Sequence, residues 1–372
     1  MRLLVVSNYY DNHVGGIESV AGQLARRLVR RGVELTWAAA GPAPQGVPAR
    51  PLRSLNVLER RFGLPFPICS PVDLARLLAQ VRRYDVVHLH ECLYLANQAV
   101  FAVARVSATP VVVTQHVAPI PYRSRVARIS MELLARTAAP LVLGGADRCV
   151  FVSARVQEVY ARFVRFRHPP RVIPNGVDLT LFHPVDEPTR AACRAALSAD
   201  GRPIALFVGR FVEKKGIIWV RHLAAAFPGV RFLLAGAGPL DPSGWGLPNV
   251  AVLGPVQHAR LPDVYRAADL LILPSLGEGF PLVVQEAMAC GTPALVSEET
   301  ATALPGFAEQ AFASPLEPAA LERAFASAVG AVGPARRAQV ARWAAAHWDW
   351  ERCTDTYLAL LREVTAGGAK AR

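Results

Sequence analysis

Residues 3–32 have the sequence LLVVSNYYDNHVGGIESVAGQLARRLVRRG, and this stretch contains the unit from which the fold follows. Its first five residues, 3–7, form a continuous apolar run, which is typical of a strand buried on both faces. Residues 16–32 have the apolar spacing of an amphipathic helix, and Gly32 marks the end of that helix. Apolar strands that alternate with helices predict a parallel, doubly wound α/β sheet.

The same alternation continues to about residue 175 and indicates one complete domain. Residues 41–70 are rich in Pro and Gly, so we expect an irregular connection there. Further strands are predicted over 33–40, 85–90, 110–116, 147–153 and 171–175, and helices over 71–84, 125–137 and 155–166.

A second series follows residues 176–202, which contain turn signals and no strong strand and which we interpret as a linker. The sequence predicts two domains of similar construction, 1–180 and 181–350, that face a central cleft, and a terminal helix over 351–372. In this second series we expect strands over 203–209, 230–236, 249–254, 269–275 and 292–297, and helices over 215–226, 259–268, 282–290, 317–330, 334–346 and 349–365.

The composition excludes several classes of protein. A hydrophobic content of 52% is enough for sizeable cores and excludes disorder. Six scattered cysteines with no C-x-x-C pair argue against a zinc ribbon or a disulfide framework and suit a reducing cytosol. The opening apolar stretch is too short for a signal peptide, and no run of about 18 apolar residues predicts a spanning helix.

The net charge of +12 is unevenly distributed. Residues 1–184 contain 23 arginines and 11 acidic residues, whereas residues 185–372 contain 18 of each sign. A basic domain favours an anionic partner, such as a phosphorylated ligand, an acidic membrane face or nucleic acid, although a solvated arginine-rich surface explains the charge equally well. No nucleic-acid-binding motif accompanies this charge, so we expect no nucleic-acid partner.

Cations follow the first strand of the second domain in the segment GRFVEKKG, residues 209–216. Arg210 and Lys215 are predicted to project from a strand-to-helix turn, where fixed cations beside helix-terminal amides favour a diphosphate. A departing nucleotide diphosphate gains negative charge, so these cations would stabilise the transition state. We expect the neighbouring Lys214 to face solvent.

Two carboxylates occur in EGFPLVVQEAMACGTP, residues 278–293. Glu278 precedes a predicted helix and Glu286 lies within it, and carboxylates are suitable acceptors for the hydroxyls of a sugar or a ribose. Gly236 and Gly238 form a tight turn without the G-x-G-x-x-G pattern, which disfavours a nicotinamide enzyme.

In the first domain, Gly15 and Gly16 stand at a helix start, where a glycine lets the backbone approach an anion. His116 ends a predicted strand at the edge where ligands bind in such sheets. His88 and His90 share one strand face, but no third ligand has suitable spacing, so we expect no metal site.

These motifs together resemble glycosyltransferase family 4. The resemblance rests on VGGIES, PNGVD (174–178), GRFVEKKG, LLAGAGP and EGFPLVVQE, and it covers nearly the whole chain. It implies the GT-B fold, two Rossmann-like domains with terminal helices that cross back to the first, and a retaining, metal-independent hexosyl- or related glycosyltransferase (EC 2.4). It also implies a UDP- or GDP-sugar as donor substrate and no cofactor.

The resemblance also implies roles for individual residues. Glu278, His116, Arg210 and Lys215 would lie at the reacting centre, with Glu278 on the donor sugar. The implied donor-binding set is Gly15, Gly16, Arg210, Lys215, Val256, Glu278, Gly279, Phe280, Leu282 and Glu286. Many relatives have glycine where this chain has Pro281, which removes one amide from the loop.

The charge distribution suggests the acceptor. Basic and apolar residues alternate near 120–128 and 162–171, a combination that suits an anionic bilayer. We therefore expect a cytoplasmic enzyme, peripheral on the inner membrane face, that glycosylates a lipid-linked saccharide for envelope polysaccharide. The alternatives are a soluble transferase with a small-molecule acceptor, a phosphorolytic enzyme of similar fold, and a non-transferase sugar-phosphate-binding protein.

Overall fold

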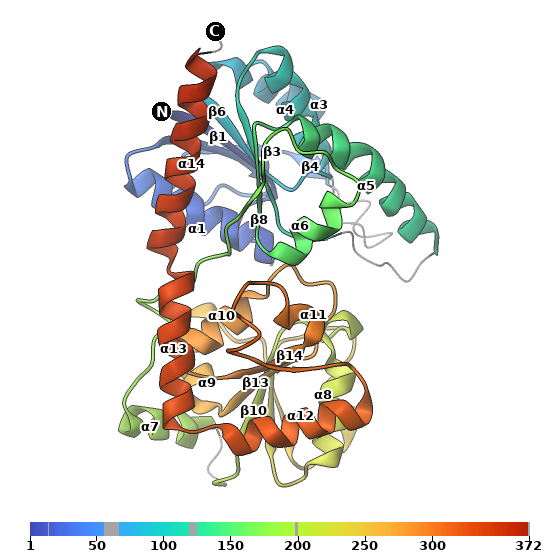
Figure 1. Ribbon diagram of the computed structural model, residues 1–372, viewed down its shortest axis with the longest axis vertical. Helices are drawn as coiled ribbons and strands as arrows, with labels where there is room; N and C mark the ends of the chain where they lie inside the picture. The colour runs from blue at the N-terminus through green and yellow to red at the C-terminus, as the bar shows by residue number, and fades with distance from the viewer. Residues whose placement is uncertain (14, 56–66, 119–124, 198–199, 371–372) are drawn as a thin grey trace. The chain divides into compact units, whose positions relative to one another are not determined.

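The computed structural model describes residues 1–13, 15–55, 67–118, 125–197 and 200–370, and the chain divides into two compact units. The first unit comprises Met1–Asn175 together with the chain from Glu351 onward, and the second comprises Gly176–Trp350. Each unit is built around one parallel sheet with helices on both faces (Figure 1). The predicted α/β class with two doubly wound sheets is confirmed.

The sheet of the first unit has the strand order β3-β2-β1-β6-β7-β8-β9, and every neighbouring pair is parallel. A separate antiparallel pair is formed by β4 (Ser54–Leu55) and β5 (Ile68–Cys69). The strands of the main sheet are β1 (Arg2–Tyr9), β2 (Glu34–Ala40), β3 (Ala49–Leu52), β6 (Val86–His90), β7 (Val111–Gln115), β8 (Arg148–Phe151) and β9 (Arg171–Val172).

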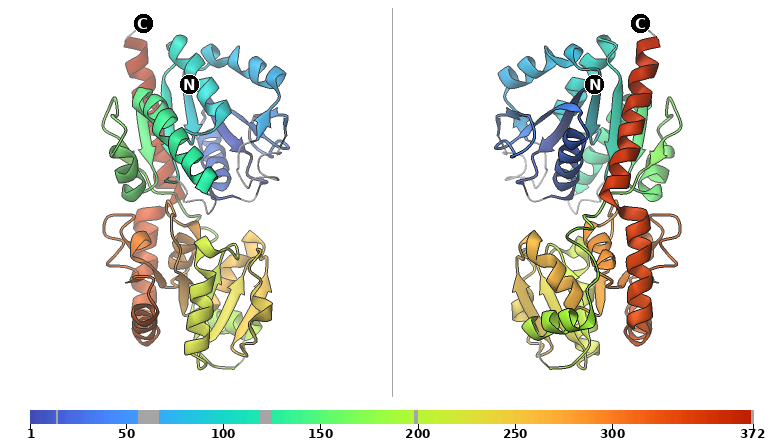
Figure 2. Two further views of the ribbon diagram at one scale, coloured as in Figure 1. Left: turned by 90° about the vertical axis from the view of Figure 1, so that its right-hand side faces the viewer. Right: turned by 90° about the vertical axis from the view of Figure 1, so that its left-hand side faces the viewer.

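Helices cover both faces of this sheet (Figures 1 and 2). On one face lie α1 (Gly16–Arg30) and α14 (Trp350–Lys370), and on the other lie α3 (Pro71–Leu78), α4 (Leu95–Val106), α5 (Arg125–Gly145) and α6 (Ala154–Ala161), with the 3₁₀ turn η1 (Val81–Arg83) after α3. The core on this second face joins Val6 and Leu89 of the sheet to Val100 and Val142 of the helices. Strands covered on both faces explain the continuous apolar runs in the sequence.

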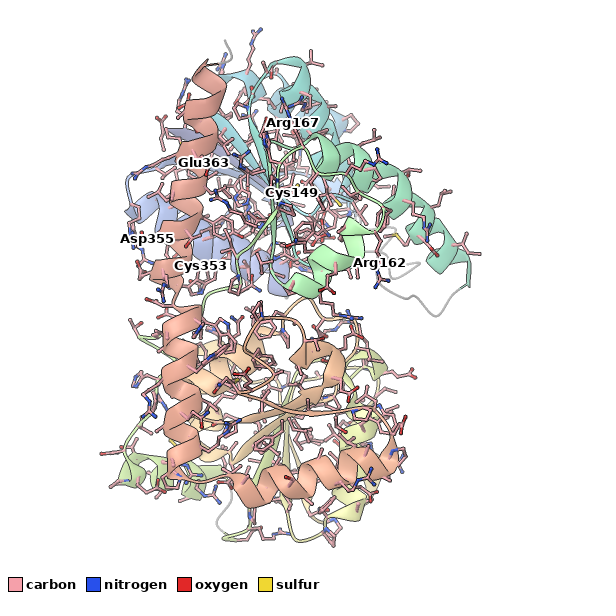
Figure 3. The ribbon with its side chains drawn as sticks, viewed as in Figure 1. Cys149, Arg162, Arg167, Cys353, Asp355 and Glu363 are labelled. Atoms are coloured by element: carbon pink, nitrogen blue, oxygen red, sulfur yellow. The ribbon has the colours of Figure 1, made fainter. Side chains whose placement is uncertain are left out.

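Ion pairs join α14 to the rest of the first unit. Arg31 pairs with Glu351 at 2.6 Å and also with Asp355. Further along the helix, Glu363 accepts from Arg148 at 2.6 Å and from Arg171 at 2.7 Å; Figure 3 labels Asp355 and Glu363 on α14. Four arginine contacts therefore align the last helix with this unit.

The second unit repeats this plan with the strand order β12-β11-β10-β13-β14-β15, again parallel throughout. Its strands are β10 (Ile204–Val208), β11 (Arg231–Ala235), β12 (Val250–Gly254), β13 (Leu270–Leu273), β14 (Ala294–Ser297) and β15 (Phe312–Ser314).

Helices cover both faces of the second sheet too. One face carries α8 (Ile217–Ala226) and α12 (Pro318–Ala331), and the ring of Phe325 on α12 stacks on Phe232 of β11. The other face carries α7 (Glu187–Leu197), α9 (Leu261–Ala267), α10 (Leu282–Ala289) and α13 (Pro334–Trp348). Short elements complete the unit: α11 (Glu298–Ala301) and the 3₁₀ turns η2 (Glu213–Lys215), η3 (Pro242–Trp245) and η4 (His258–Arg260).

The structure corrects several sequence predictions. Helix α4 was not predicted, and the predicted irregular stretch 41–70 contains strand β3; residues 56–66 of that stretch lie outside the described residues. Helix α5 continues eight residues past the predicted end at 137, and α6 ends at Ala161 instead of 166.

The predicted linker contains helix α7, and the reason it was missed is physical. No residue of α7 is buried, and two of the four residues on its partly buried face, Arg190, Cys193, Arg194 and Leu197, are arginines, so this face does not form an apolar stripe in the sequence. Its arginines hold it instead: Arg190 and Arg194 donate to Asp269, which precedes β13, at 2.6 and 2.7 Å.

Each sheet has one point where the strand order reverses. In the first unit β1 and β6 are neighbours at this point, and in the second β10 and β13 are neighbours. The loops after such strands diverge to opposite faces, which opens space at the carboxyl edge and makes it the usual ligand site of doubly wound sheets.

We predict that Gly216→Ala destabilises the protein by about 2–4 kcal/mol. Gly216 has φ +78°, and a Cβ there would lie 2.0 Å from the carbonyl oxygen of Pro274. Gly246→Ala is the matched control, because Gly246 has φ +68° and no neighbouring atom within 4 Å of a Cβ. Gly246→Ala should lower the free energy of unfolding by only about 1 kcal/mol, which is the cost of placing alanine in the left-handed backbone conformation. Urea unfolding measures both, and equal losses would contradict the close contact with Pro274.

Candidate functional site

The turn after β10 is held by the backbone of the neighbouring loop. Gly209 N donates to Ala235 O at 3.0 Å, and Phe211 N donates to Ala237 O at 2.9 Å. A Cβ on Gly236 would lie 1.9 Å from Gly209 O, so only glycine permits this approach. The glycines of LLAGAGP therefore fix the turn that carries Arg210.

Lys215 and Glu278 meet at this edge of the sheet. The ammonium of Lys215 lies 2.9 Å from Oε1 of Glu278, and the two side chains are 25% and 13% exposed. Glu278 stands in the loop between β13 and α10, whose path is fixed by Leu276 N donating to Lys214 O at 3.0 Å. The segments GRFVEKKG and EGFPLVVQE, which lie far apart in the sequence, thus meet at one site.

Lys214 does not face solvent, contrary to the sequence prediction. Its side chain is half-buried, and burial lowers its pKa, while Glu278 and Glu299 act in the opposite direction. Glu299 also accepts a hydrogen bond from Gly277 N at 2.8 Å. Because Lys214 also interacts electrostatically with Arg210, which is exposed, three cations and two carboxylates gather here.

Glu286 is held by two partners on neighbouring elements. Buried Tyr265 donates its hydroxyl to Oε2 at 2.8 Å, and His258 Nε2 lies 3.3 Å from Oε1. The hydrogen bond to Glu286 raises the pKa of His258. His258 is 53% exposed at its side chain, so a ligand hydroxyl can reach the shared Oε1 from that side. Sequence reasoning missed His258, although it lies two residues after Val256, which belongs to the donor-binding set that the resemblance implies.

The start of α10 offers backbone groups more than side chains. Phe280 is buried, and the centroid of its ring lies 5.1 Å from that of Phe307 and 5.3 Å from that of Trp348. Its ring is therefore committed to the core, and only its main chain is available to a ligand. Gly279 is buried and Leu282 is partly exposed, on either side of the N-cap residue Pro281.

The two glycines at the start of α1 have different surroundings. A Cβ on Gly15 would lie 2.1 Å from Oε2 of Glu18, so this glycine makes room for a buried carboxylate. Gly16 is exposed, and no atom of the described residues lies within 4 Å of its Cβ position. Gly16 is therefore the glycine that a ligand can approach closely.

His116 follows β7 and is only 4% exposed. Its backbone N–H donates to Oε1 of Glu91 at 2.7 Å, and its Nε2 lies 2.9 Å from Nδ1 of His90. Burial lowers the pKa of His116 to about 3, so the ring is neutral at physiological pH. Glu91 was missed, although it follows strand 85–90 directly and the strand-end rule applied to the other sites would have selected it.

The predicted residues fall in both units. Gly15, Gly16 and His116 belong to the first, and Arg210, Lys215, Val256, Glu278, Gly279, Phe280, Leu282 and Glu286 belong to the second. Within the described part of the chain, no group of three or more His, Cys, Asp or Glu side chains is arranged to hold a metal ion. No described helix is long and apolar enough to cross a membrane.

Part of the predicted basic segment lies outside the described residues. Positions 120–123 are among these, and the side chains of Arg125 and Arg128 are likewise not described.

Comparison with known families identifies the chain. Residues 14–181 match the family model described as Glycosyltransferase Family 4, and residues 202–331 match Glycosyl transferases group 1. The chain belongs to this glycosyltransferase family. The second match spans the turn of Arg210 and the loop of Glu278, and the first spans the loops of Gly16 and His116.

Curated relatives support this family membership. D-inositol 3-phosphate glycosyltransferases of Mycobacterium tuberculosis and Mycobacterium bovis are 32% identical over 315 residues, which is 73% of this chain. The match covers 62% of each relative, so the chain spans about three fifths of the length of these relatives.

Solved structures show that this family member has the GT-B fold. Sucrose-phosphate synthase from Thermosynechococcus elongatus superposes with a TM-score of 0.75 at 21% identity, covering 99% of this chain and 100% of that one. HepE of Anabaena in complex with UDP has a TM-score of 0.76 at 18% identity, covering 98% and 100%.

We predict that Lys214→Arg lowers stability by about 1–3 kcal/mol, since the larger planar guanidinium overpacks a half-buried site. Lys215→Arg is the matched control, and we expect it to cost less than about 1 kcal/mol because that head group is paired near the surface. Denaturant unfolding of both variants tests this difference. A Lys214→Arg protein as stable as the wild type would restore the solvent-facing interpretation.

Proposed function

We propose that the protein transfers a sugar from a nucleotide-sugar donor to an acceptor hydroxyl, with retention of configuration and without a metal ion. The observation that carries the proposal is the Lys215–Glu278 ion pair with Arg210 and Lys214 nearby, at the carboxyl edge where the loops after the neighbouring strands β10 and β13 diverge. Cations and an acceptor carboxylate at this point match the two halves of a nucleotide-sugar: a diphosphate and a polyol.

The donor would be held by groups that the second unit already orders. Arg210 and Lys215 bind the diphosphate, and Glu278 accepts hydrogen bonds from hydroxyls of the donor sugar. Glu286, held by Tyr265, accepts the ribose hydroxyls at its open oxygen. The main chain at Gly279 and Phe280 supports the sugar, Leu282 begins the helix behind it, and the backbone at Val256 contacts the base.

The chemical step needs little from protein side chains. The bond between the anomeric carbon and the diphosphate oxygen breaks, the acceptor oxygen bonds to the same face of that carbon, and the acceptor proton passes to the departing oxygen. Arg210 and Lys215 stabilise the negative charge that develops on the diphosphate. The main chain at Gly16 donates to a phosphate oxygen, and neutral His116 hydrogen-bonds to the sugar without changing its own charge.

The ligands of similar solved structures suggest which donor to test first. HepE of Anabaena is solved with UDP and with UDP-glucose. We therefore propose a UDP-sugar ahead of a GDP-sugar.

We predict that Arg210→Ala weakens UDP binding by about 10- to 100-fold, which corresponds to losing a charge-assisted hydrogen bond. Uridine binding should be unchanged, because the lost group contacts only the diphosphate. Arg221→Ala is the matched control, since Arg221 is an exposed arginine on α8. Calorimetric titration gives both affinities, and an equal loss for uridine and UDP would show that Arg210 does not bind phosphate.

We further propose that the acceptor is a lipid-linked saccharide reached at an anionic membrane on the cytoplasmic side. The apolar side chains Ile129, Leu133 and Leu141 are 54–71% exposed on α5. Exposed arginines follow α6, and Figure 3 labels Arg162 and Arg167 there. The backbone oxygen of Arg165 lies 3.1 Å from a Cβ built on Gly144, so the end of α5 and this basic segment adjoin.

A small phosphorylated acceptor is the second candidate. The curated relatives are named for D-inositol 3-phosphate, and an anionic small molecule would also suit the arginine surplus of the first half. A non-transferase sugar-phosphate-binding protein of the same fold is the remaining alternative, and it predicts donor binding without turnover.

We predict that the protein sediments with phosphatidylglycerol vesicles at low salt. The double variant Arg162→Glu, Arg165→Glu should weaken this binding by about 10-fold or more, because each basic residue near an anionic membrane contributes about 1 kcal/mol of binding free energy. Arg342→Glu is the matched control, since Arg342 is exposed on α13. If the wild type stays in the supernatant, the membrane proposal fails and the soluble acceptor gains support.

A further inference from the structure

Two buried residues contact His116 from the neighbouring strand. His90 is the last residue of β6 and Glu91 follows it, and they are 0% and 3% exposed. Strands β6 and β7 pair in parallel, so their carboxyl ends bring these residues beside the loop after Gln115. A buried acid and a buried imidazole at this edge need a reason beyond packing, because each is costly to remove from water.

Glu91 holds the main chain of the His116 loop. Its Oε1 accepts hydrogen bonds from His116 N at 2.7 Å and Val117 N at 3.1 Å, and its Oε2 accepts from the side-chain amide of Gln115. Two of these donors are successive backbone amides. One carboxylate therefore determines the path of three consecutive residues.

Glu91 has a strained backbone conformation, and neighbouring hydrogen bonds hold it. Its φ of 76° is in the left-handed region, which costs a residue other than glycine about 1–2 kcal/mol. The side-chain amide of Asn97 donates to the carbonyl oxygens of His90 at 2.6 Å and Glu91 at 2.7 Å. These bonds hold the strained peptide from which the Glu91 carboxylate reaches the β7 loop.

His90 holds the ring of His116. Nδ1 of His90 lies 2.9 Å from Nε2 of His116, and the rings stack with centroids 5.2 Å apart and 20° between their planes. Burial lowers the pKa of both imidazoles, so both are neutral and one nitrogen of the pair must donate while the other accepts.

The unused nitrogen of His90 decides which ring donates. Its Nε2 is buried and has no hydrogen-bond partner among the described residues. A buried N–H without an acceptor is rarer than a buried acceptor without a donor. The proton of His90 therefore belongs on Nδ1, which donates to Nε2 of His116 and leaves the proton of His116 on its Nδ1.

We propose that His90 and Glu91 are positioning residues for His116: Glu91 fixes its main chain, and His90 fixes its ring in the Nδ1–H tautomer. His116 then offers an N–H donor to a sugar or phosphate oxygen. It cannot take the acceptor proton at that nitrogen, so the proton must pass to the departing phosphate oxygen. This inference rests on the role proposed for His116 in transfer.

The tautomer is directly measurable. In protein with ¹⁵N-labelled histidine rings, ¹⁵N–¹H correlation spectra distinguish Nδ1–H from Nε2–H, and His116→Gln identifies the His116 signals. We expect the wild type to show the Nδ1–H form. His90→Leu should shift His116 to a mixture or to Nε2–H, and His90→Asn should restore the wild-type form because its amide nitrogen occupies the place of Nδ1. An Nε2–H wild type, or no change in His90→Leu, overturns the role of His90.

The role of Glu91 is tested by a glycine variant. Glu91→Gly relieves the left-handed backbone but removes the carboxylate, so a purely conformational role predicts no loss. We expect hydrogen exchange at His116 N and Val117 N to accelerate by about 10-fold or more, because the amides lose their acceptor. Glu91→Gln keeps an acceptor oxygen, so its exchange rates at these two amides should stay within about 3-fold of the wild-type rates. Unchanged exchange in Glu91→Gly overturns the role of Glu91.

Kinetics separate this inference from the proposed function. With a working donor and acceptor, His90→Leu should lower kcat by about 10-fold and leave the donor KM unchanged, because His116 would be misplaced relative to the reacting atoms. His90→Asn should restore the wild-type kcat. If the wild type has no transferase activity but the spectra and exchange behave as stated, the proposed function fails and the positioning of His116 stands. If His90→Leu changes the tautomer but not kcat, positioning for transfer is overturned.

Discussion

The structure depends on one constraint: each sheet is parallel throughout, so all its strands end at the same edge. Parallel strands require crossover connections, most of which contain helices here, and those helices bury both faces of the sheet, as at Leu206, Leu234 and Ile272 in the second unit. With both faces covered, the carboxyl edge is where polar loops gather. His116, Glu91, Arg210 and Glu278 all follow strands at that edge, although they are far apart in the sequence.

Several charged groups at the carboxyl edge of the second sheet lie beside groups of opposite charge. Lys215 pairs with Glu278, Glu299 lies near Lys214, and His258 pairs with Glu286. The proposed binding of a diphosphate and a sugar would need both signs of charge, and the ion pairs order these loops without a ligand. At the carboxyl edge of the first sheet, burial keeps the histidines neutral and raises the pKa of Glu91 to about 8, while the N–H donors of His116, Val117 and Gln115 act in the opposite direction.

Glycines determine how closely the loops can pack, and each has a local reason. Gly236 admits the backbone of Gly209, Gly15 admits the carboxylate of Glu18, and Gly176 in PNGVD packs against Trp350, where a Cβ would lie 2.4 Å from the indole. Gly16, by contrast, has no atom of the described residues within 4 Å of its Cβ position. A motif glycine thus belongs to the packing of the fold or to the approach of a ligand, and contacts distinguish the two.

The sequence by itself determined the α/β class, the two doubly wound sheets and the family, because buried parallel strands leave continuous apolar runs and the motifs stand in a fixed order. It placed Arg210, Lys215, Glu278 and His116 at strand ends by the same rule. Their roles in transfer stay predictions.

Only the tertiary structure decided which groups meet. The exposure of Lys214, the His258–Glu286 pair, the hydrogen bonds from the His116 loop to Glu91 and the anchoring of helix α7 by its arginines have no periodic signal in the sequence. Each depends on contacts between residues from separate elements, and local sequence does not encode such contacts.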